Sequence, residues 1–148
     1  MSESCVSYVK SHPEAEIRTR EGSQGYDLKA VRFISENNNV YMFGTGIHIE
    51  FPHDYYGHIY ARSSLTKKGI IVTNSVGIID NDYRGEILVA LSSINNKPIN
   101  VDELIGAFIV QLILFRCNSA FTFNEKKEIS DTNRGSGGFG STEKLISQ

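Results

Sequence analysis

Cysteine is scarce in this sequence, which contains two cysteines and no tryptophan among its 148 residues. Cys5 and Cys117 are too few for a disulfide framework and lack the spacing of a zinc site. Cys117 ends an apolar run, so we expect it to be a buried free thiol. No apolar run approaches the roughly 18–20 residues of a membrane span, and the first residues lack the layout of a signal peptide. We therefore predict an intracellular protein, cytoplasmic or nuclear.

An excess of charge of one sign is also missing. The sequence has 15 Lys and Arg against 17 Asp and Glu, so its net charge is −2, and its pI is about 6.1. Proteins that coat nucleic acid need clustered Lys and Arg, so the composition argues against nucleic acid as a partner. A pocket for a single nucleotide needs only a few charges and is compatible with this balance.

Short apolar runs broken by turn residues fill most of the sequence. Turn signals recur about every 8–12 residues, which is typical of an all-β sandwich or barrel, and the length indicates one domain. We expect strands at residues 26–34, 40–43, 46–51, 57–61, 70–73, 77–79 and 86–91. Residues 63–68 predict one helical turn. Residues 101–115 carry both helix and strand signals, and we favour a buried strand.

The chain carries a glycine-rich segment near its end, from Arg134 to Thr142. Glycines permit positive φ, so successive backbone N–H groups can converge on an anion. Arg134 offers a planar fork suited to phosphate oxygens, and Phe139 a flat face for a base. The same composition also fits a flexible tail. From Ser130 onward the sequence is typical of an extended arm.

A second candidate is the segment at residues 77–85, which separates two expected strands. Asn81 and Asp82 favour turns, so a β-hairpin explains much of it. Asp80 directly follows two isoleucines at a strand end. A carboxylate there would be partly desolvated and restricted, which suits a general base, although a turn cap is the other interpretation.

Other polar residues stand in apolar surroundings. Ser63 and Ser64 follow a strand and open the expected helical turn, so they could form an anion site or cap the helix. Asp27 could hold a metal or belong to a turn. Gln111 lies inside an apolar run and needs a partner. The four histidines show no metal spacing, and we assign none of them a role.

Taken together, these segments resemble the trimeric dUTP pyrophosphatases (dUTPases). That family carries five ordered motifs, and the sequence contains all five in order, over about residues 15–142. They lie at residues 25–28, 61–65, 77–85, 106–113 and 134–142.

The resemblance implies a jelly-roll-like β-barrel that assembles as a homotrimer, with each active site drawing on three subunits. Residues 1–130 would form the barrel and residues 131–148 a flexible arm that carries the glycine-rich lid. The implied reaction converts dUTP and water to dUMP and pyrophosphate with Mg²⁺. It keeps uracil out of DNA and supplies dUMP for thymidylate synthesis.

The resemblance also implies roles for single residues. Asp80 would activate the attacking water, Tyr83 would pack under the deoxyribose, and Asp27 would orient waters on Mg²⁺ rather than bind the metal directly. A hairpin from Asn74 to Asp80, with its return strand near Leu88, would recognise uracil. The implied substrate-binding residues are Arg62, Ser63, Ser64, Asn74, Gly77, Ile78, Ile79, Tyr83, Leu88, Gln111, Arg134, Gly137, Gly138, Phe139, Ser141 and Thr142.

Three positions depart from the family pattern. Ser64 stands where many members have glycine, Phe108 where many have arginine, and Glu143 where a glycine is usual. Two other functions stay open at this point. A dCTP deaminase on the same fold needs a glutamate where this sequence has Ala90 and an arginine where it has Lys67. A regulatory trimer that binds a protein partner would keep the fold with or without the reaction.

Overall fold

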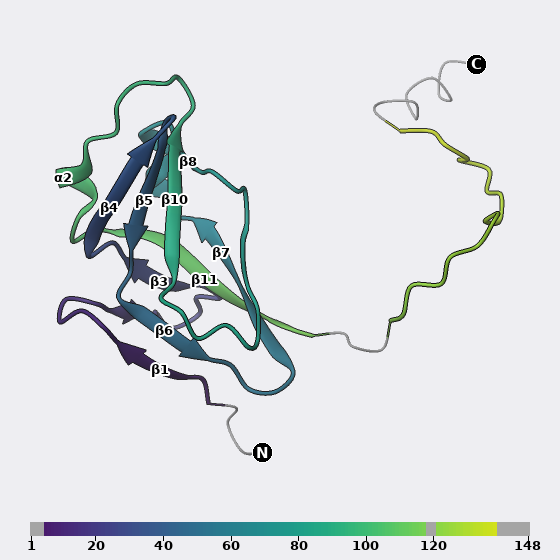
Figure 1. Ribbon diagram of the computed structural model, residues 1–148, viewed down its shortest axis with the longest axis horizontal. Helices are drawn as coiled ribbons and strands as arrows, with labels where there is room; N and C mark the ends of the chain where they lie inside the picture. Colours follow the sequence, from purple (N-terminus) through teal and green to yellow (C-terminus); the bar gives the residue numbers. More distant parts are fainter. Residues whose placement is uncertain (1–4, 118–120, 139–148) are drawn as a thin grey trace. The chain divides into compact units, whose positions relative to one another are not determined.

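The computed structural model describes residues 5–117 and 121–138 (Figure 1). The chain divides into two compact units, Met1–Asn118 and Ser119–Gln148. In the second unit, the described residues form turns and irregular backbone, without a helix or strand. Within the described residues, no helix is long and apolar enough to cross a membrane.

The first unit is built almost entirely from antiparallel strands, which confirms the all-β prediction. Three sheets run in the orders β1-β6, β4-β5-β10-β8 and β2-β3-β11-β7-β9. The strands are β1 (Ser7–Lys10), β2 (Ile17–Arg18), β3 (Tyr26–Lys29), β4 (Arg32–Asn37), β5 (Val40–Gly44), β6 (Ile47–Glu50), β7 (Tyr55–Ala61), β8 (Ile70–Val72), β9 (Gly77–Ile79), β10 (Leu88–Ser93) and β11 (Phe108–Arg116). In Figure 1, β4, β5 and β10 lie side by side as one layer of this unit.

The core lies between the sheets and draws on all of them. Phe43 and Leu91 come from the four-stranded sheet, Leu28 and Ile109 from the five-stranded sheet, and Ile47 from β6; all five are almost fully buried. Apolar side chains alternate between the core and the outer face along β6 and β7, as the alternation in the sequence predicts, whereas β1 and β4 are exposed along their length.

Residues 26–34 form two strands, although we expected one. The chain passes from one sheet to the other at two buried residues. The N–H of Ala30 donates to the carbonyl oxygen of Ala107, at 3.0 Å, and that of Val31 to the carbonyl oxygen of Gly44, at 2.9 Å. The alternation of side chains continues through this crossing, so the sequence alone shows no break.

Residues 101–115 are a short helix followed by a strand, so the prediction of one strand was wrong in its first part. Helix α2 (Val101–Leu104) has Asp102 and Glu103 in its first turn, where carboxylates favour a helix N-terminus. Gly106 then adopts φ +84°, which separates α2 from β11. The expected helical turn at 63–68 is confirmed as α1 (Ser63–Lys67).

Two further expectations fail. Residues 77–79 and 86–91 flank a predicted hairpin, but β9 pairs only with β7, while β10 pairs with β5 and β8. The two strands belong to different sheets, so the connection between them is a crossover. Cys117 is half-exposed rather than buried, because it lies just past the exposed end of β11. Strands β1 and β2 were not predicted, since both are short and β1 is exposed along its length.

Candidate functional site

Most of the residues predicted to recognise the base and the sugar line one pocket. This pocket has a volume of about 230 Å³ and lies where β9 and β10 come together. Its lining consists of Asn74, Gly77, Ile78, Ile79, Asp80, Tyr83 and Leu88. The fold thus brings residues of the third motif and Leu88 to one pocket, although β9 and β10 are not hydrogen-bonded to each other.

Strand β9 reaches this pocket as an edge strand. It is the last strand of its sheet, and its only partner, β7, covers one edge. An edge strand presents unpaired N–H and C=O groups along its other side. The backbone of Gly77–Ile79 therefore offers both donors and acceptors beside the pocket.

The loop that follows β9 holds Asp80 in place through its neighbours. The Asn81 side-chain amide donates to the carbonyl oxygens of Pro52, at 2.9 Å, and Tyr55, at 2.7 Å. The N–H of Tyr83 donates to the carbonyl oxygen of Asp80, at 3.1 Å. Asp80 itself is exposed, so the predicted partial desolvation of its carboxylate is wrong for the protomer alone.

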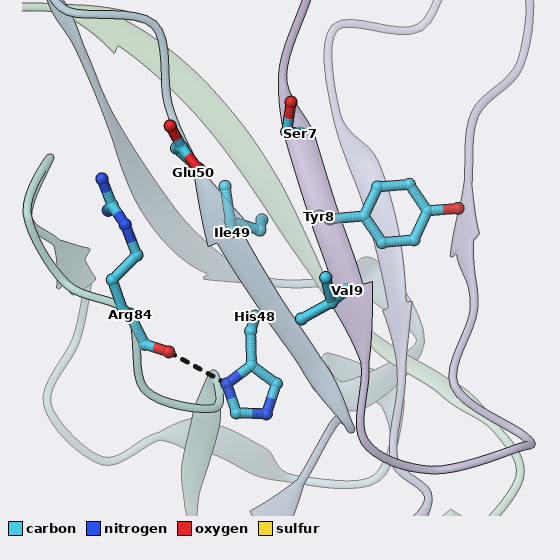
Figure 2. A pocket seen from close by; sticks show the side chains of 7 residues that line it. All are labelled: Ser7, Tyr8, Val9, His48, Ile49, Glu50 and Arg84. Atoms are coloured by element: carbon cyan, nitrogen blue, oxygen red, sulfur yellow. Dashed lines mark hydrogen bonds between the residues drawn. The ribbon is translucent and has the colours of Figure 1, made fainter.

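The far end of the same loop is held by His48, to which we assigned no role. Its Nδ1 lies 3.0 Å from the carbonyl oxygen of Arg84 (Figure 2). Its Nε2 lies 3.0 Å from Oγ of Ser11. A carbonyl only accepts, so Nδ1 carries the proton, and a neutral ring then accepts from the Ser11 hydroxyl. Both contacts lie at a pocket of about 260 Å³ beside β1 and β6, which His48 and Arg84 help to line.

A second group of predicted residues surrounds Asp27. Its Oδ1 lies 3.0 Å from Nε of Arg62, and its Oδ2 lies 2.9 Å from Nη2 of Arg18. Arg62 also donates from Nη1 to the carbonyl oxygen of Phe108, at 2.9 Å. The ion pair of Asp27 with Arg62 connects the first and second motifs, and the hydrogen bond from Arg62 to Phe108 connects the second with the fourth. Asp27 is buried and Arg62 half-buried. Arg18 was not predicted, because it precedes the first motif and no local pattern marks it.

Gln111 finds the partner that its apolar surroundings require. Its amide Nε2 donates to the carbonyl oxygen of Ala61, at 3.2 Å. Its amide oxygen lies so close to Gly25 that a Cβ there would overlap it. Gly25 is therefore required for this packing, and the first, second and fourth motifs meet at this point as well.

The paired serines do not cap α1. The N-cap residue is Arg62, without a side-chain cap bond, and Ser63 and Ser64 form the first turn. Both are exposed, and neither hydroxyl makes a hydrogen bond among the described residues. The capping interpretation is thus wrong, and both hydroxyls face solvent. They follow Arg62, which belongs to the Asp27 cluster of Arg18, Asp27, Arg62 and Gln111.

The glycine-rich segment lies in the second unit and is described only up to Gly138. Nε of Arg134 donates to the carbonyl oxygen of Gly137, at 3.0 Å, and Gly135 adopts φ +55°. The predicted residues Phe139, Ser141 and Thr142 lie outside the described residues.

Within the described part of one protomer, the pocket and the Asp27 cluster are separate. No hydrogen bond or ion pair joins the residues that line the pocket to Asp27, Arg62 or Gln111. In residues 5–117 and 121–138, no group of three or more His, Cys, Asp or Glu side chains could hold a metal ion.

Known proteins similar to this chain carry one family name. The dUTPase family model matches residues 13–143. The deoxyuridine 5′-triphosphate nucleotidohydrolase of Helicobacter pylori strain P12 is 38% identical over 141 residues, which covers 93% of this chain and 95% of that protein. The enzyme of the same name from Desulfitobacterium hafniense is 35% identical over 144 residues, covering 93% of each chain.

Solved structures show the same fold. The dUTPase of Staphylococcus bacteriophage 80alpha, solved with dUpNHpp, matches with a TM-score of 0.74 at 20% identity, covering 93% of this chain and 98% of that chain. The EIAV dUTPase matches with a TM-score of 0.62 at 26% identity, covering 87% and 98%. On the extent of the family match and the identity to its curated members, this chain belongs to the dUTPase family.

Proposed function

We propose that this protein hydrolyses dUTP to dUMP and pyrophosphate, which keeps uracil out of DNA and supplies dUMP for thymidylate synthesis. The observation that carries the proposal is the pocket beside the β9 edge, which has Asp80 and Tyr83 in its lining, in a chain that belongs to the dUTPase family.

The edge of β9 supports the recognition of uracil. Its free backbone donors and acceptors can pair with the complementary groups on the edge of the ring. The 4-amino group of cytosine would place a donor where uracil has an acceptor, which leaves buried polar groups unpaired and strongly disfavours binding. Gly77, Ile78 and Ile79 would make these contacts, with Asn74 and Leu88 completing the walls.

Tyr83 would exclude ribonucleotides by packing under the deoxyribose. Its phenol donates to the carbonyl oxygen of Glu86, which holds the ring at the pocket wall. A 2′-hydroxyl would need space that a fixed ring does not leave.

Asp80 would act as the general base. It takes a proton from a water molecule, whose oxygen attacks the α-phosphorus. The bond from that phosphorus to the bridging oxygen of the β-phosphate breaks, and pyrophosphate leaves with the electron pair. The exposed carboxylate has no ion-pair partner within the described residues, so it is available to accept the proton.

The Asp27 cluster would hold the triphosphate. The exposed hydroxyls of Ser63 and Ser64 can donate to phosphate oxygens. Arg62 directly precedes them as the N-cap of α1, and Gln111 bonds the carbonyl oxygen of Ala61, the residue before Arg62. Each oxygen of Asp27 already faces an arginine, so direct coordination of Mg²⁺ would place a further cation beside two guanidinium groups. The residues fit a role toward the waters of Mg²⁺, which keeps several waters beside phosphate ligands.

We further propose a homotrimer of jelly-roll-like barrels with active sites shared between subunits. In the described part of one protomer, no hydrogen bond or ion pair joins the pocket beside β9 to the Asp27 cluster. A partner subunit could therefore contribute the Asp27 cluster that completes an active site. A largely apolar pocket of about 400 Å³, lined by Cys5, Val6, Tyr8, Ile17, Tyr26, Leu112 and Leu114, offers surface for such contact. Residues 1–130 would form the barrel domain.

Residues 131–148 would close over the bound nucleotide. Arg134 would neutralise charge on the γ-phosphate, and Phe139 would stack on uracil. Gly137, Gly138, Ser141 and Thr142 would complete the lid. Closure excludes water from the site and strengthens its electrostatic contacts.

The test of the proposed reaction is pyrophosphate release from dUTP, dCTP, dTTP and UTP in the presence of Mg²⁺. We expect release from dUTP alone, and a loss of at least about 100-fold in Asp80→Asn with binding of dUTP retained. Ammonia release from dCTP would establish the deaminase instead. No reaction with any nucleotide, from a folded protein, would favour the regulatory binding protein.

Shared sites are tested by mixing two inactive variants. Asp80→Asn and a chain that ends at Asn133 are refolded separately and together in equal amounts. If each site takes Asp80 and the lid from different subunits, random trimers recover about a quarter of wild-type activity. Activity that stays at the level of the separate variants would show that each site is built within one subunit.

A further inference from the structure

We propose that Arg18, on β2, binds the triphosphate of the substrate and supplies the cation that residue 108 lacks in this chain. The inference rests on the proposed function. Arg18 lies outside all five family motifs, and Phe108 stands where many members of the family have arginine.

The register of three strands places Arg18 in one row with Asp27 and Gln111, two residues of the Asp27 cluster. Arg18 pairs with Asp27 across β2 and β3, and Asp27 pairs with Gln111 across β3 and β11. Residues paired in this way share one face of a sheet, and neighbouring strands lie about 4.8 Å apart. The backbone of Arg18 is therefore about 10 Å from that of Gln111, on the same face.

The guanidinium of Arg18 lies over the ring of Phe108, with its Cζ 3.8 Å from the ring centroid. Its Nη2 donates to Oδ2 of Asp27, at 2.9 Å. These two contacts hold the group above residue 108, in the space through which an arginine side chain at that position would extend. The aromatic face favours a cation there.

The cluster carries one positive charge more than Asp27 can balance. Two guanidinium groups, those of Arg18 and Arg62, share the single carboxylate. Lys29 also lies near the Phe108 ring, at 5.1 Å from its centroid, but its ammonium is paired with Glu16 at 2.6 Å. The surplus charge therefore belongs to the two arginines, beside the exposed hydroxyls of Ser63 and Ser64.

Arg18 also has hydrogen-bonding capacity to spare. A guanidinium has five N–H donors, and in the described structure Arg18 uses Nη2 toward Asp27, while its Nε is buried without a partner. The side chain as a whole is 40% exposed, so the Nη donors that do not face Asp27 can meet a ligand from solvent. A planar fork of this kind matches phosphate oxygens.

A purely structural role, in which Arg18 only holds Asp27, makes a different prediction. Loss of such a support would weaken binding of every nucleotide, whereas loss of a triphosphate contact weakens only ligands that carry the β- and γ-phosphates. Comparing the triphosphate analogue dUpNHpp with dUMP therefore separates the two roles.

The experiment measures binding of dUpNHpp and dUMP, and KM and kcat for dUTP, in the full-length protein. Arg18→Gln should raise the dissociation constant for dUpNHpp and the KM for dUTP by about 10- to 100-fold, typical for loss of one charge-assisted contact. Binding of dUMP should change by less than about twofold. Lys29→Gln is the matched control, because it removes the other cation near the same ring; its effect on dUpNHpp should also stay below about twofold.

A double variant that places arginine at residue 108, where many family members have it, tests the proposal more directly. In the double variant Arg18→Gln with Phe108→Arg, at least about tenfold of the lost dUpNHpp affinity should return. If Arg18→Gln does not fold, as judged by thermal melting, Arg18→Lys replaces it in the experiment, because lysine keeps a positive charge beside Asp27. It should still bind dUpNHpp at least about threefold less tightly, with dUMP unchanged.

Wild-type affinity for dUpNHpp in Arg18→Gln, or an equal loss for dUMP, would overturn the proposal. So would a double variant no better than the single one. Any of these results would leave the proposed function intact as long as the wild-type protein hydrolyses dUTP. Failure of the proposed function would instead appear as an inactive wild-type protein.

Discussion

The phenolic oxygen of Tyr83 donates a 2.8 Å hydrogen bond to the carbonyl oxygen of Glu86. The ring crosses directly over Gly85, so that a Cβ on Gly85 would overlap the phenol. The glycine is thus the reason why Tyr83 can stay against the wall of the pocket.

The first prediction concerns this contact. Gly85→Ala should push the ring of Tyr83 out of place and reduce the preference for dUTP over UTP by at least about tenfold. The measurement is the ratio of kcat/KM for the two nucleotides. Tyr83→Phe keeps the ring and loses only the hydrogen bond, so its effect should be smaller. An unchanged ratio in Gly85→Ala would show that the position of the ring does not set sugar selectivity.

The second prediction concerns Asn81, whose amide bonds two carbonyl oxygens near the start of β7. Asn81→Ala leaves both carbonyls without this partner and should reduce the free energy of unfolding by about 1–3 kcal/mol. It should also lower kcat, because Asp80 is the preceding residue. Urea unfolding and dUTP turnover provide the two measurements.

Asp82→Ala is the matched control for that change. Asp82 is exposed and makes no side-chain hydrogen bond within the described residues, so its loss should change stability by less than about 0.5 kcal/mol. Equal effects of the two variants would contradict the anchoring role of Asn81.

The third prediction concerns the glycine-rich segment. Ending the chain at Asn133 should lower kcat/KM for dUTP by at least about 100-fold, because the lid no longer orients the triphosphate. The first unit, Met1–Asn118, is compact by itself, so the melting temperature should stay within a few degrees of wild type. Sizing before and after truncation checks the assembly. A truncated protein of normal activity would remove the lid from the reaction.

The fourth prediction is a dependence of stability on pH through Glu103 in α2. Its hydrogen bond with Lys68, at 2.8 Å, and the charge of that lysine hold the pKa of the carboxyl below its ordinary value of 4.5. A lowered pKa in the folded state adds stability above about pH 4.5, and this gain disappears as the pH falls through the folded-state pKa.

Glu103→Gln should therefore be less stable than wild type at pH 7 by a small amount, and the difference should be smaller at pH 3 than at pH 7. Midpoints of urea unfolding at both pH values measure it, and added salt should shrink the difference at pH 7, since the pair is exposed. Asp102→Asn, a neighbour in the same helix without an ion pair in the described structure, is the control. A difference between Glu103→Gln and wild type that persists at pH 3 would contradict the ionic origin.

Strand positions followed from the sequence where apolar and polar residues alternate between flanking turns. Val40–Gly44 and Tyr55–Ala61 were predicted to within two residues at each end, since alternation and flanking turns are local signals. The crossing at Ala30 and Val31 was not predictable, because the backbone changes its hydrogen-bonding partners there without any change in side-chain pattern. The helix α2 was missed because its four residues are too few for helical periodicity to show.

The sequence by itself determined the kinds of groups in the candidate site and their order along the chain. It carries Asp80 after a strand, paired serines after another, and glycines around Phe139. Only the tertiary structure decided which of these groups meet. Pairing of β2 with β3 and of β3 with β11 brings Arg18, Asp27 and Gln111 into one row. The pairing of β3 with β11 joins segments that lie far apart in the chain, so local sequence patterns do not encode it.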